Sequence, residues 1–319
     1  MISPDAILFI ASEREFRDAA LELFHFQAKK CEPYSRYIEL TGVDTGKVDT
    51  LAKIPFLPVE IFKNQYVYCG KQKPEIIFTS STTGGGLPSK HYVESHNWYL
   101  KVCRTAFEHF YGPVAEWSFY GLLPSYLERE GSSLITMGEE FISVGGGGVY
   151  LHNHKDMIER MASDPKKKMV IGVTYALLEL AEELAPKLKN TVVVETGGMK
   201  GHSPEMLRSE LHGELTEAFG IGYIASEYGM CEMMSQCYSK GSGIFESPPW
   251  VRILIRDMND PFDISVTGRG GINIIDLANA SSCAFIQTSD IGTLFPDNKF
   301  ELTGRIKGSD IRGCNLMLA

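Results

Sequence analysis

Residues 76–93 read IIFTSSTTGGGLPSKHYV, an apolar run that leads into four consecutive hydroxyl side chains, three glycines, a proline and a lysine. The apolar run predicts a strand. Glycines allow backbone N–H groups to approach an anion closely, and neighbouring hydroxyls and a lysine add donors and charge. The spacing is not that of a Walker A loop. The stretch predicts either a phosphate-binding loop or a flexible surface loop. The candidate phosphate-binding residues are Ser80, Ser81, Thr82, Thr83, Gly84 and Lys90.

The composition is that of an ordinary globular protein. The chain has 319 residues, of which 44% are hydrophobic and 22% charged, with a net charge of -9 and a pI near 5.5. This acidic balance argues against nucleic acid as a partner. The N-terminal residues lack the basic region of a signal peptide, and no apolar run is long enough to span a membrane. We therefore expect a soluble, cytoplasmic protein with no membrane span. Its seven scattered cysteines are expected to be reduced thiols.

Strands and helices are expected to alternate through the middle of the chain. Short β-branched or apolar runs at 169–173, 191–195 and 221–225 suit buried strands, and helical patterns at 174–184 and 203–218 lie between them. The predicted fold is therefore α/β, with mainly parallel sheets covered by helices and a β-rich C-terminal subdomain. The expected domains are an N-terminal helical segment and connector (1–72), an α/β nucleotide-binding core (73–226) and the β-rich part (227–319). Ligands of such sheets collect at the carboxyl ends of the strands.

Two of the predicted strand ends carry residues suited to a nucleotide. Gly197 and Gly198 follow the run at 191–195 and would let a flat ligand approach the backbone, although a plain turn has the same composition. The sequence SEYGMCE follows the run at 221–225, where Tyr228 offers a stacking ring, Gly229 offers space, and Glu232 offers a carboxylate for Mg²⁺. A helix start with Glu232 near its dipole is the alternative for this stretch.

A third strand end is expected at residues 287–292, QTSDIG. The carboxylate of Asp290 can accept two hydrogen bonds from a ribose diol. An Asx turn in a hairpin is the other interpretation of this stretch.

These motifs together resemble the signatures of adenylate-forming enzymes. That family has four short motifs, namely Ser-Gly-Thr-Thr-Gly with Pro-Lys in the phosphate loop, Tyr-Gly-x-Thr-Glu, Thr-Gly-Asp and a Gly-Arg hinge. This chain departs from the first three, because Ser81 replaces a glycine, Cys231 replaces a threonine and Ser289 replaces a glycine. The resemblance implies adenine packing near Gly197 and on Tyr228, Mg²⁺ on Glu232, ribose on Asp290, and Arg305 reaching ribose and phosphate. ATP and Mg²⁺ are the implied cofactors.

One branch of that family, the acyl-protein synthetases, resembles the chain from about Ile54 onward. The matching segments are IPFLP at 54–58, PSKHYV at 88–93, PPW at 248–250 and the RGC ending at 312–314. Typical adenylate-forming enzymes continue into a small domain with a catalytic lysine, whereas five residues follow Cys314 here. The resemblance implies adenylation of a carboxylic acid, expected to be a fatty acid, and transfer to a protein thiol.

The candidate catalytic residues are Lys90, Glu232 and Cys314. Cys314 is a candidate acyl acceptor because a thiolate is strongly nucleophilic, and a buried hydrophobic role is its alternative. Two further functions stay open, namely a ligase that transfers the acyl group to coenzyme A or a carrier protein, and a nucleotide-binding partner without activity.

Overall fold

The computed structural model describes residues 4–81, 86–123, 131–151, 153–197 and 207–306. Thr82, Thr83, Gly84, Gly198 and Cys314, all predicted site residues, lie outside these ranges.

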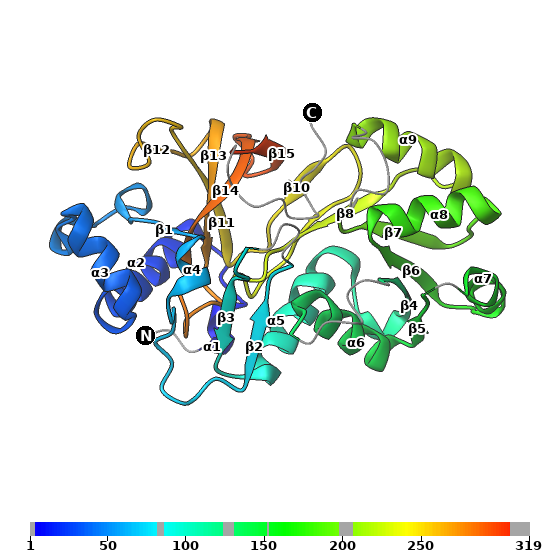
Figure 1. The fold of residues 1–319 in the computed structure, drawn as a ribbon, viewed down its shortest axis with the longest axis horizontal. Helices are drawn as coiled ribbons and strands as arrows, with labels where there is room; N and C mark the ends of the chain where they lie inside the picture. Colours follow the sequence, from blue (N-terminus) through cyan, green and yellow to red (C-terminus); the bar gives the residue numbers. More distant parts are fainter. Residues whose placement is uncertain (1–3, 82–85, 124–130, 152, 198–206, 307–319) are drawn as a thin grey trace.

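Five parallel strands form one half of the main sheet (Figure 1). In spatial order they are β5 (Gly147–Val149), β4 (Trp117–Leu122), β6 (Lys167–Gly172), β7 (Thr191–Glu195) and β8 (Ala225–Tyr228). Every residue of β4 is buried, as expected of a strand covered on both faces. The predicted α/β class is confirmed in this half.

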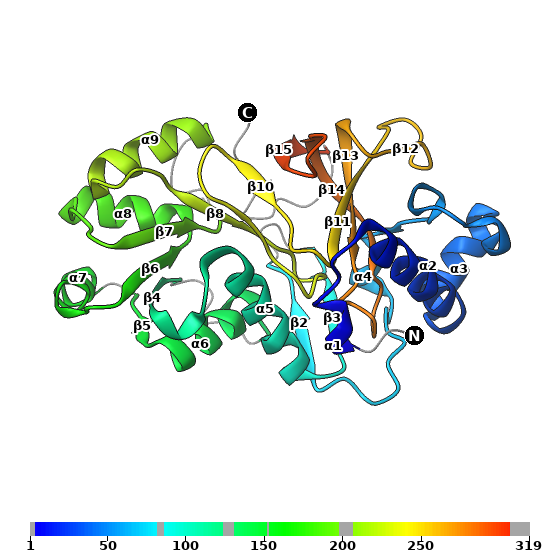
Figure 2. The same ribbon diagram turned by 180° about the vertical axis from the view of Figure 1, so that it is seen from behind.

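Helices cover both faces of the parallel strands. Neighbouring residues of a strand point to opposite faces, so each strand contributes apolar side chains to two separate core clusters. Tyr120 and Val193 pack in one core cluster with residues of α7 (His154–Ser163), α8 (Thr174–Leu184) and α9 (Arg208–Phe219). Phe119 and Val194 pack in the other, with residues of α5 (His96–Tyr111) and α6 (Ser133–Gly145). Figures 1 and 2 show α8 and α9 on one side of these strands, and α5 and α6 on the other.

The second half of the sheet is antiparallel and forms the expected β-rich C-terminal part. Continuing from β8, the order is β9 (Cys237–Ser239), β10 (Ile244–Glu246), β15 (Phe300–Arg305), β14 (Phe285–Leu294), β13 (Gly268–Asp276), β11 (Val251–Arg256) and β12 (Ile264–Ser265). The short β1 (Leu57–Pro58) pairs parallel with β14. The strands are parallel up to β8, and β9 pairs with β8 in the antiparallel direction. The candidate site lies where these two halves of the sheet meet.

The N-terminal helices pack beside this antiparallel half (Figure 1). They are α1 (Pro4–Ile7), α2 (Glu13–Lys30), α3 (Glu32–Thr41) and α4 (Ile61–Asn64). Gln27 of α2 donates to the carbonyl oxygens of Asn279 and Ala280 and accepts from the N–H of Ala284. One buried amide thus ties the N-terminal helix to the loop between β13 and β14.

The predicted phosphate loop lies between two paired strands, β2 (Ile76–Thr79) and β3 (Lys90–Val93). These strands pair in antiparallel register from Ile76 with Val93 to Thr79 with Lys90. The run at 76–78 does form a strand, as predicted, but in a separate two-stranded sheet.

Two local predictions differ from the structure. The strand expected at 221–225 begins only at Ala225, because the N–H of Ile221 bonds to the carbonyl of Thr216 and closes the end of α9. The stretch around Tyr228 is therefore strand β8 itself. Asp290 was expected at a strand end, but it lies inside β14, which continues to Leu294 past a register shift at Ile291. The long pairing with β13 and β15 overrides the turn preference of its sequence.

Candidate active site

A cavity of about 100 Å³ lies between the two halves of the sheet. Its lining comes from the segment after β2, the start of α6, the turn after β8, and the facing strands β14 and β15. Six of the predicted site residues line it: Ser80, Ser81, Tyr228, Gly229, Asp290 and Arg305. The fold thus brings residues of four sequence motifs to one cavity.

The base of the predicted phosphate loop is closed by Ser80 and Ser89. The N–H of Ser80 bonds to the carbonyl of Ser89 at 3.1 Å, and the N–H of Ser89 bonds to Oγ of Ser80 at 2.9 Å. Both residues are buried. This clasp holds the two ends of the loop together next to the cavity. Lys90 is exposed at the start of β3 and does not line the cavity.

The glycine pair after β7 is represented by Gly197, which has a φ of 80°. Its N–H donates to Oε1 of Glu195 at 2.6 Å, and the hydroxyl of Thr174 donates to the same oxygen at 2.5 Å. The neighbouring Thr196, rather than Gly197, lines the cavity. Glu195 therefore shapes the turn that was predicted to lie near adenine.

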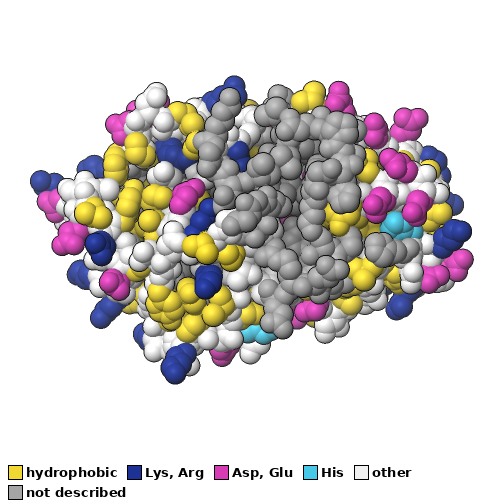
Figure 3. All heavy atoms as spheres, viewed as in Figure 1, with side chains coloured by type: hydrophobic (Ala, Val, Ile, Leu, Met, Phe, Trp, Pro, Cys, Tyr) yellow, Lys and Arg dark blue, Asp and Glu magenta, His cyan; other side chains and the backbone are white. Residues whose placement is uncertain are grey.

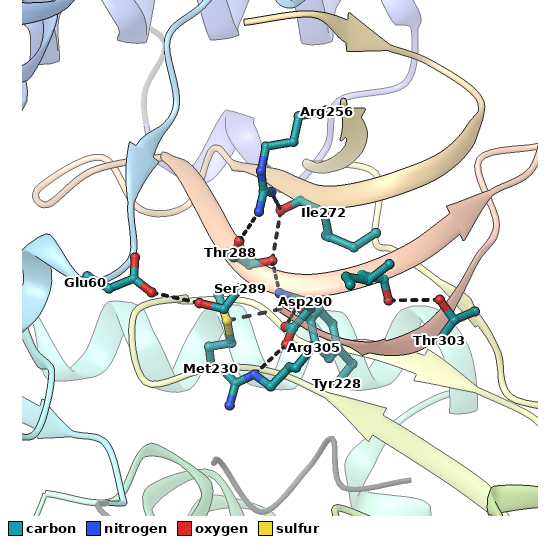
Figure 4. Close-up of polar contacts among 11 residues, drawn as sticks. Glu60, Tyr228, Met230, Arg256, Ile272, Thr288, Ser289, Asp290, Thr303 and Arg305 are labelled. Carbon is teal, nitrogen blue, oxygen red and sulfur yellow. Dashed lines mark hydrogen bonds and ion pairs between the residues drawn. The ribbon is translucent and has the colours of Figure 1, made fainter. Parts of the chain in front are cut away.

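Asp290, on β14, is the centre of a polar cluster that lines the cavity (Figure 4). The hydroxyl of Tyr228 donates to its Oδ2 at 2.8 Å, and Nε of Arg305 donates to its Oδ1 at 3.1 Å. Burial and the adjacent carboxylate raise the pKa of Tyr228 well above its usual value, so the hydroxyl stays a donor. Predicted adenine, ribose and hinge residues are thus in direct contact.

The strand around Asp290 is held by further side-chain bonds, drawn in Figure 4. The N–H of Asp290 donates to Oγ1 of Thr288, and the hydroxyl of Ser289 donates to Oε1 of Glu60 at 2.8 Å. Arg256 donates to the carbonyl oxygen of Thr288. These contacts fix the backbone on either side of the carboxylate, so its position is set before any ligand binds.

Glu232, the predicted magnesium ligand, is fully buried and does not line the cavity. Its carbonyl oxygen accepts from Nδ2 of Asn279 at 2.8 Å. The ring of His91 lies between the carbonyl of Cys231, 2.8 Å from Nδ1, and Oδ1 of Asn279, 2.9 Å from Nε2. His91 and Asn279 therefore link β3 to the turn that carries Glu232.

The described residues contain no group of three or more His, Cys, Asp or Glu side chains that could hold a metal ion. A magnesium ion would need nucleotide phosphate oxygens among its ligands. Because Glu232 does not line the cavity, the described side chains do not by themselves make a magnesium site.

Glu227 and Gln236 are among the cavity residues that the sequence motifs do not indicate. Burial, with a smaller effect of the nearby Glu195 carboxylate, raises the pKa of Glu227 to about 8. Glu227 directly precedes the predicted Tyr228, so its position beside a motif was an available signal. Gln236 lies in no motif, and only the folded chain brings it to the cavity.

Basic side chains on the face seen in Figure 3 are scattered among acidic and apolar ones, and acidic side chains gather at its right-hand edge, in the region of α8 and α9. This described part of the face therefore presents no continuous positive stripe. Among the described helices, none has both the length and the apolar character needed to cross a membrane.

Comparison with known proteins gives matches at the level of structure. No family model matches the sequence, and no curated protein matches it. A 2-hydroxyisobutyryl-CoA ligase in complex with 2-HIB-AMP and CoA is 13% identical, with a TM-score of 0.67 over 95% of this chain and 71% of the ligase.

Two further structures are similar over a smaller part. ATP-bound MatB from Rhodopseudomonas palustris is 13% identical, with a TM-score of 0.55 over 74% of this chain, and the match spans 50% of the length of MatB. The luciferase-like enzyme of the nonluminescent mealworm Zophobas morio is 16% identical, with a TM-score of 0.54 over 76% of this chain and 60% of that one. At these identities the likeness concerns the fold, and the chain has the fold of the N-terminal domain of adenylate-forming enzymes.

Proposed function

We propose that the protein activates a carboxylic acid with ATP, forming an acyl-adenylate and pyrophosphate, and then transfers the acyl group to a thiol. The observation that carries this proposal is the meeting of the loop base at Ser80 with Tyr228, Asp290 and Arg305 around one cavity. Each of these belongs to a different motif of the adenylate-forming signature, and they converge on a fold of that type.

The nucleotide is expected to lie along the cavity. The ribose diol would donate to Asp290, and Arg305, 13% exposed and paired with that carboxylate, can contact ribose and phosphate together. Ser80 and Ser81 line the end of the cavity at the phosphate loop. The role of Lys90 on the phosphates stays a prediction, and so does that of Glu232, which does not line the cavity.

The chemistry needs positioning more than covalent participation by the protein. A carboxylate oxygen of the acid attacks the α-phosphorus, and the bond to the bridging oxygen of pyrophosphate breaks. A thiolate then attacks the acyl carbon, and AMP leaves with the electron pair of the broken C–O bond. The resemblance to acyl-protein synthetases adds the finer proposal of a fatty acid and a protein thiol, with Cys314 as the candidate.

Acid-dependent exchange of labelled pyrophosphate into ATP tests the first step. We expect exchange with at least one acid of a broad panel. ATP binding without exchange for any acid would contradict the proposal and favour a nucleotide-binding partner without activity.

The acceptor is tested with a labelled acid that supports exchange. We expect label on the denatured wild-type chain and on a Cys69→Ala control, but not on Cys314→Ala. Label that appears only on added coenzyme A, with none on the chain, would instead assign the protein as an acyl-CoA ligase.

A further inference from the structure

One residue that lines the cavity carries a buried amide oxygen without a hydrogen-bond partner among the described residues. Gln236 is 5% exposed, and its Nε2 donates to the carbonyl oxygen of Met234 at 3.5 Å. Its Oε1 has no partner within the part of the chain that the structure describes. The bond from Nε2 indicates which end of the amide is the acceptor, because the reverse orientation would set two acceptors against each other. A buried acceptor of this kind needs an explanation, and Gln236 lines the cavity.

A second polar group, the carboxyl of Glu227, lines the same cavity. Burial raises the pKa of this carboxyl to about 8, which favours the protonated form at neutral pH, with one O–H donor and one carbonyl acceptor. A ligand with a positive charge would instead pair with its ionised form. Either way, the group serves a hydrogen-bonding ligand and not an alkyl chain.

Gly229 lies next to both of these side chains. A Cβ on Gly229 would lie 2.5 Å from Oε1 of Glu227 and 3.6 Å from Cγ of Gln236. The glycine therefore lets the carboxyl of Glu227 lie close to the backbone at this position. The other wall is formed in part by Leu134 and Met137, which are apolar.

We propose that Glu227 and Gln236 form a polar acyl subsite that selects an acid whose acyl part carries a hydrogen-bond donor, a hydroxyl or an amino group. This inference rests on the proposed function, since it names the class of acid that the same cavity activates. It differs from the plain fatty acid that the resemblance implies, because an alkyl chain would leave Oε1 of Gln236 buried and unpaired.

The experiment compares acids of equal size that differ in one group. Suitable sets are butanoic, 3-hydroxypropanoic and 3-aminopropanoic acids, and pentanoic, 4-hydroxybutanoic and 4-aminobutanoic acids. In pyrophosphate exchange, we expect kcat/KM for a donor-bearing acid to exceed that of its alkyl counterpart by about 100-fold or more. The hydroxyl and amino arms show which donor the site takes. Equal or better exchange with the alkyl acids would overturn the subsite while leaving acid activation intact, and would mean that the amide oxygen is paired with water only.

Gln236→Leu supplies the matched test, because it keeps the size of the side chain and removes the acceptor. We expect it to lower kcat/KM for the donor-bearing acid and to raise it for the alkyl acid, with ATP affinity unchanged. The exposed Gln65→Leu is the control and should change neither value. A parallel loss for both acids at unchanged thermal stability would overturn the proposal.

Calorimetric binding of the same acids separates the two proposals. If no acid supports exchange, the proposed function fails, but preferential binding of donor-bearing acids that Gln236→Leu abolishes would still support the subsite. Binding without preference, or no binding, would overturn it.

Discussion

The hydroxyl of Tyr228 donates to Oδ2 of Asp290 at 2.8 Å, across 62 positions of sequence. Since Nε of Arg305 donates to Oδ1, both oxygens of this carboxylate already have partners. If the proposed nucleotide binds here, its ribose diol must share the carboxylate with these partners or displace one of them. Nucleotide binding and the position of Arg305 should thus be linked.

Asp290→Asn should weaken ATP binding by about 10-fold to 100-fold, because a hydrogen bond to a charged acceptor is worth about 1.5–3 kcal/mol. Isothermal calorimetry with ATP measures the change. Asp297→Asn, at an exposed turn, is the control and should bind ATP as the wild type does. Unchanged affinity in Asp290→Asn would remove Asp290 from the nucleotide site.

Tyr228→Phe should lower the free energy of unfolding by about 1–3 kcal/mol, because it leaves a buried carboxylate oxygen without its donor. Urea denaturation followed by fluorescence gives the value. Tyr66 is 52% exposed, so Tyr66→Phe should shift the midpoint little. A Tyr228→Phe variant as stable as the wild type would show that the bond contributes nothing net.

Glu227 should make stability depend on pH. Its pKa in the folded protein is raised from 4.5 to about 8, so the folded state holds a proton that the unfolded state has released. The contribution is complete below about pH 4.5 and is lost as the pH rises through 8, with a slope of at most about 1.4 kcal/mol per pH unit. Urea midpoints of wild type and Glu227→Gln across this range should diverge accordingly, and parallel curves would refute the assignment.

Gly229→Ala should displace the carboxyl of Glu227, since the new Cβ would lie 2.5 Å from its Oε1. That atom is the end of a flexible side chain, so we expect a stability loss below about 1 kcal/mol. The KM for the acid should rise about tenfold or more. An unchanged KM would show that the position of Glu227 does not govern acid recognition.

His91→Ala should cost about 2–4 kcal/mol of stability, because it leaves a cavity and two buried oxygen atoms, on Cys231 and Asn279, without their ring partner. The nearby His96→Ala, at a less buried helix start, is the control. Comparable losses in both variants would show that the bridge from β3 to the turn at Glu232 is not special.

The sequence by itself determined the α/β class, the strand that leads into the predicted phosphate loop, and three residues that line the cavity, namely Ser80, Tyr228 and Asp290. These features depend on local patterns, namely apolar runs, glycines and short motifs, which can be recognised without knowing what packs against them. The helices on both faces of the parallel strands followed from the same patterns.

Only the tertiary structure decided how these residues meet. Asp290 lies inside β14 because pairing with β13 and β15 extends the strand past a sequence that favours a turn. The contact of Asp290 with Tyr228, and the arrival of Gln236 beside Glu227, depend on the packing of segments far apart in the chain. Burial raises the pKa of Glu227 and leaves the amide oxygen of Gln236 without a partner among the described residues. Burial is a property of the folded chain that no local pattern carries.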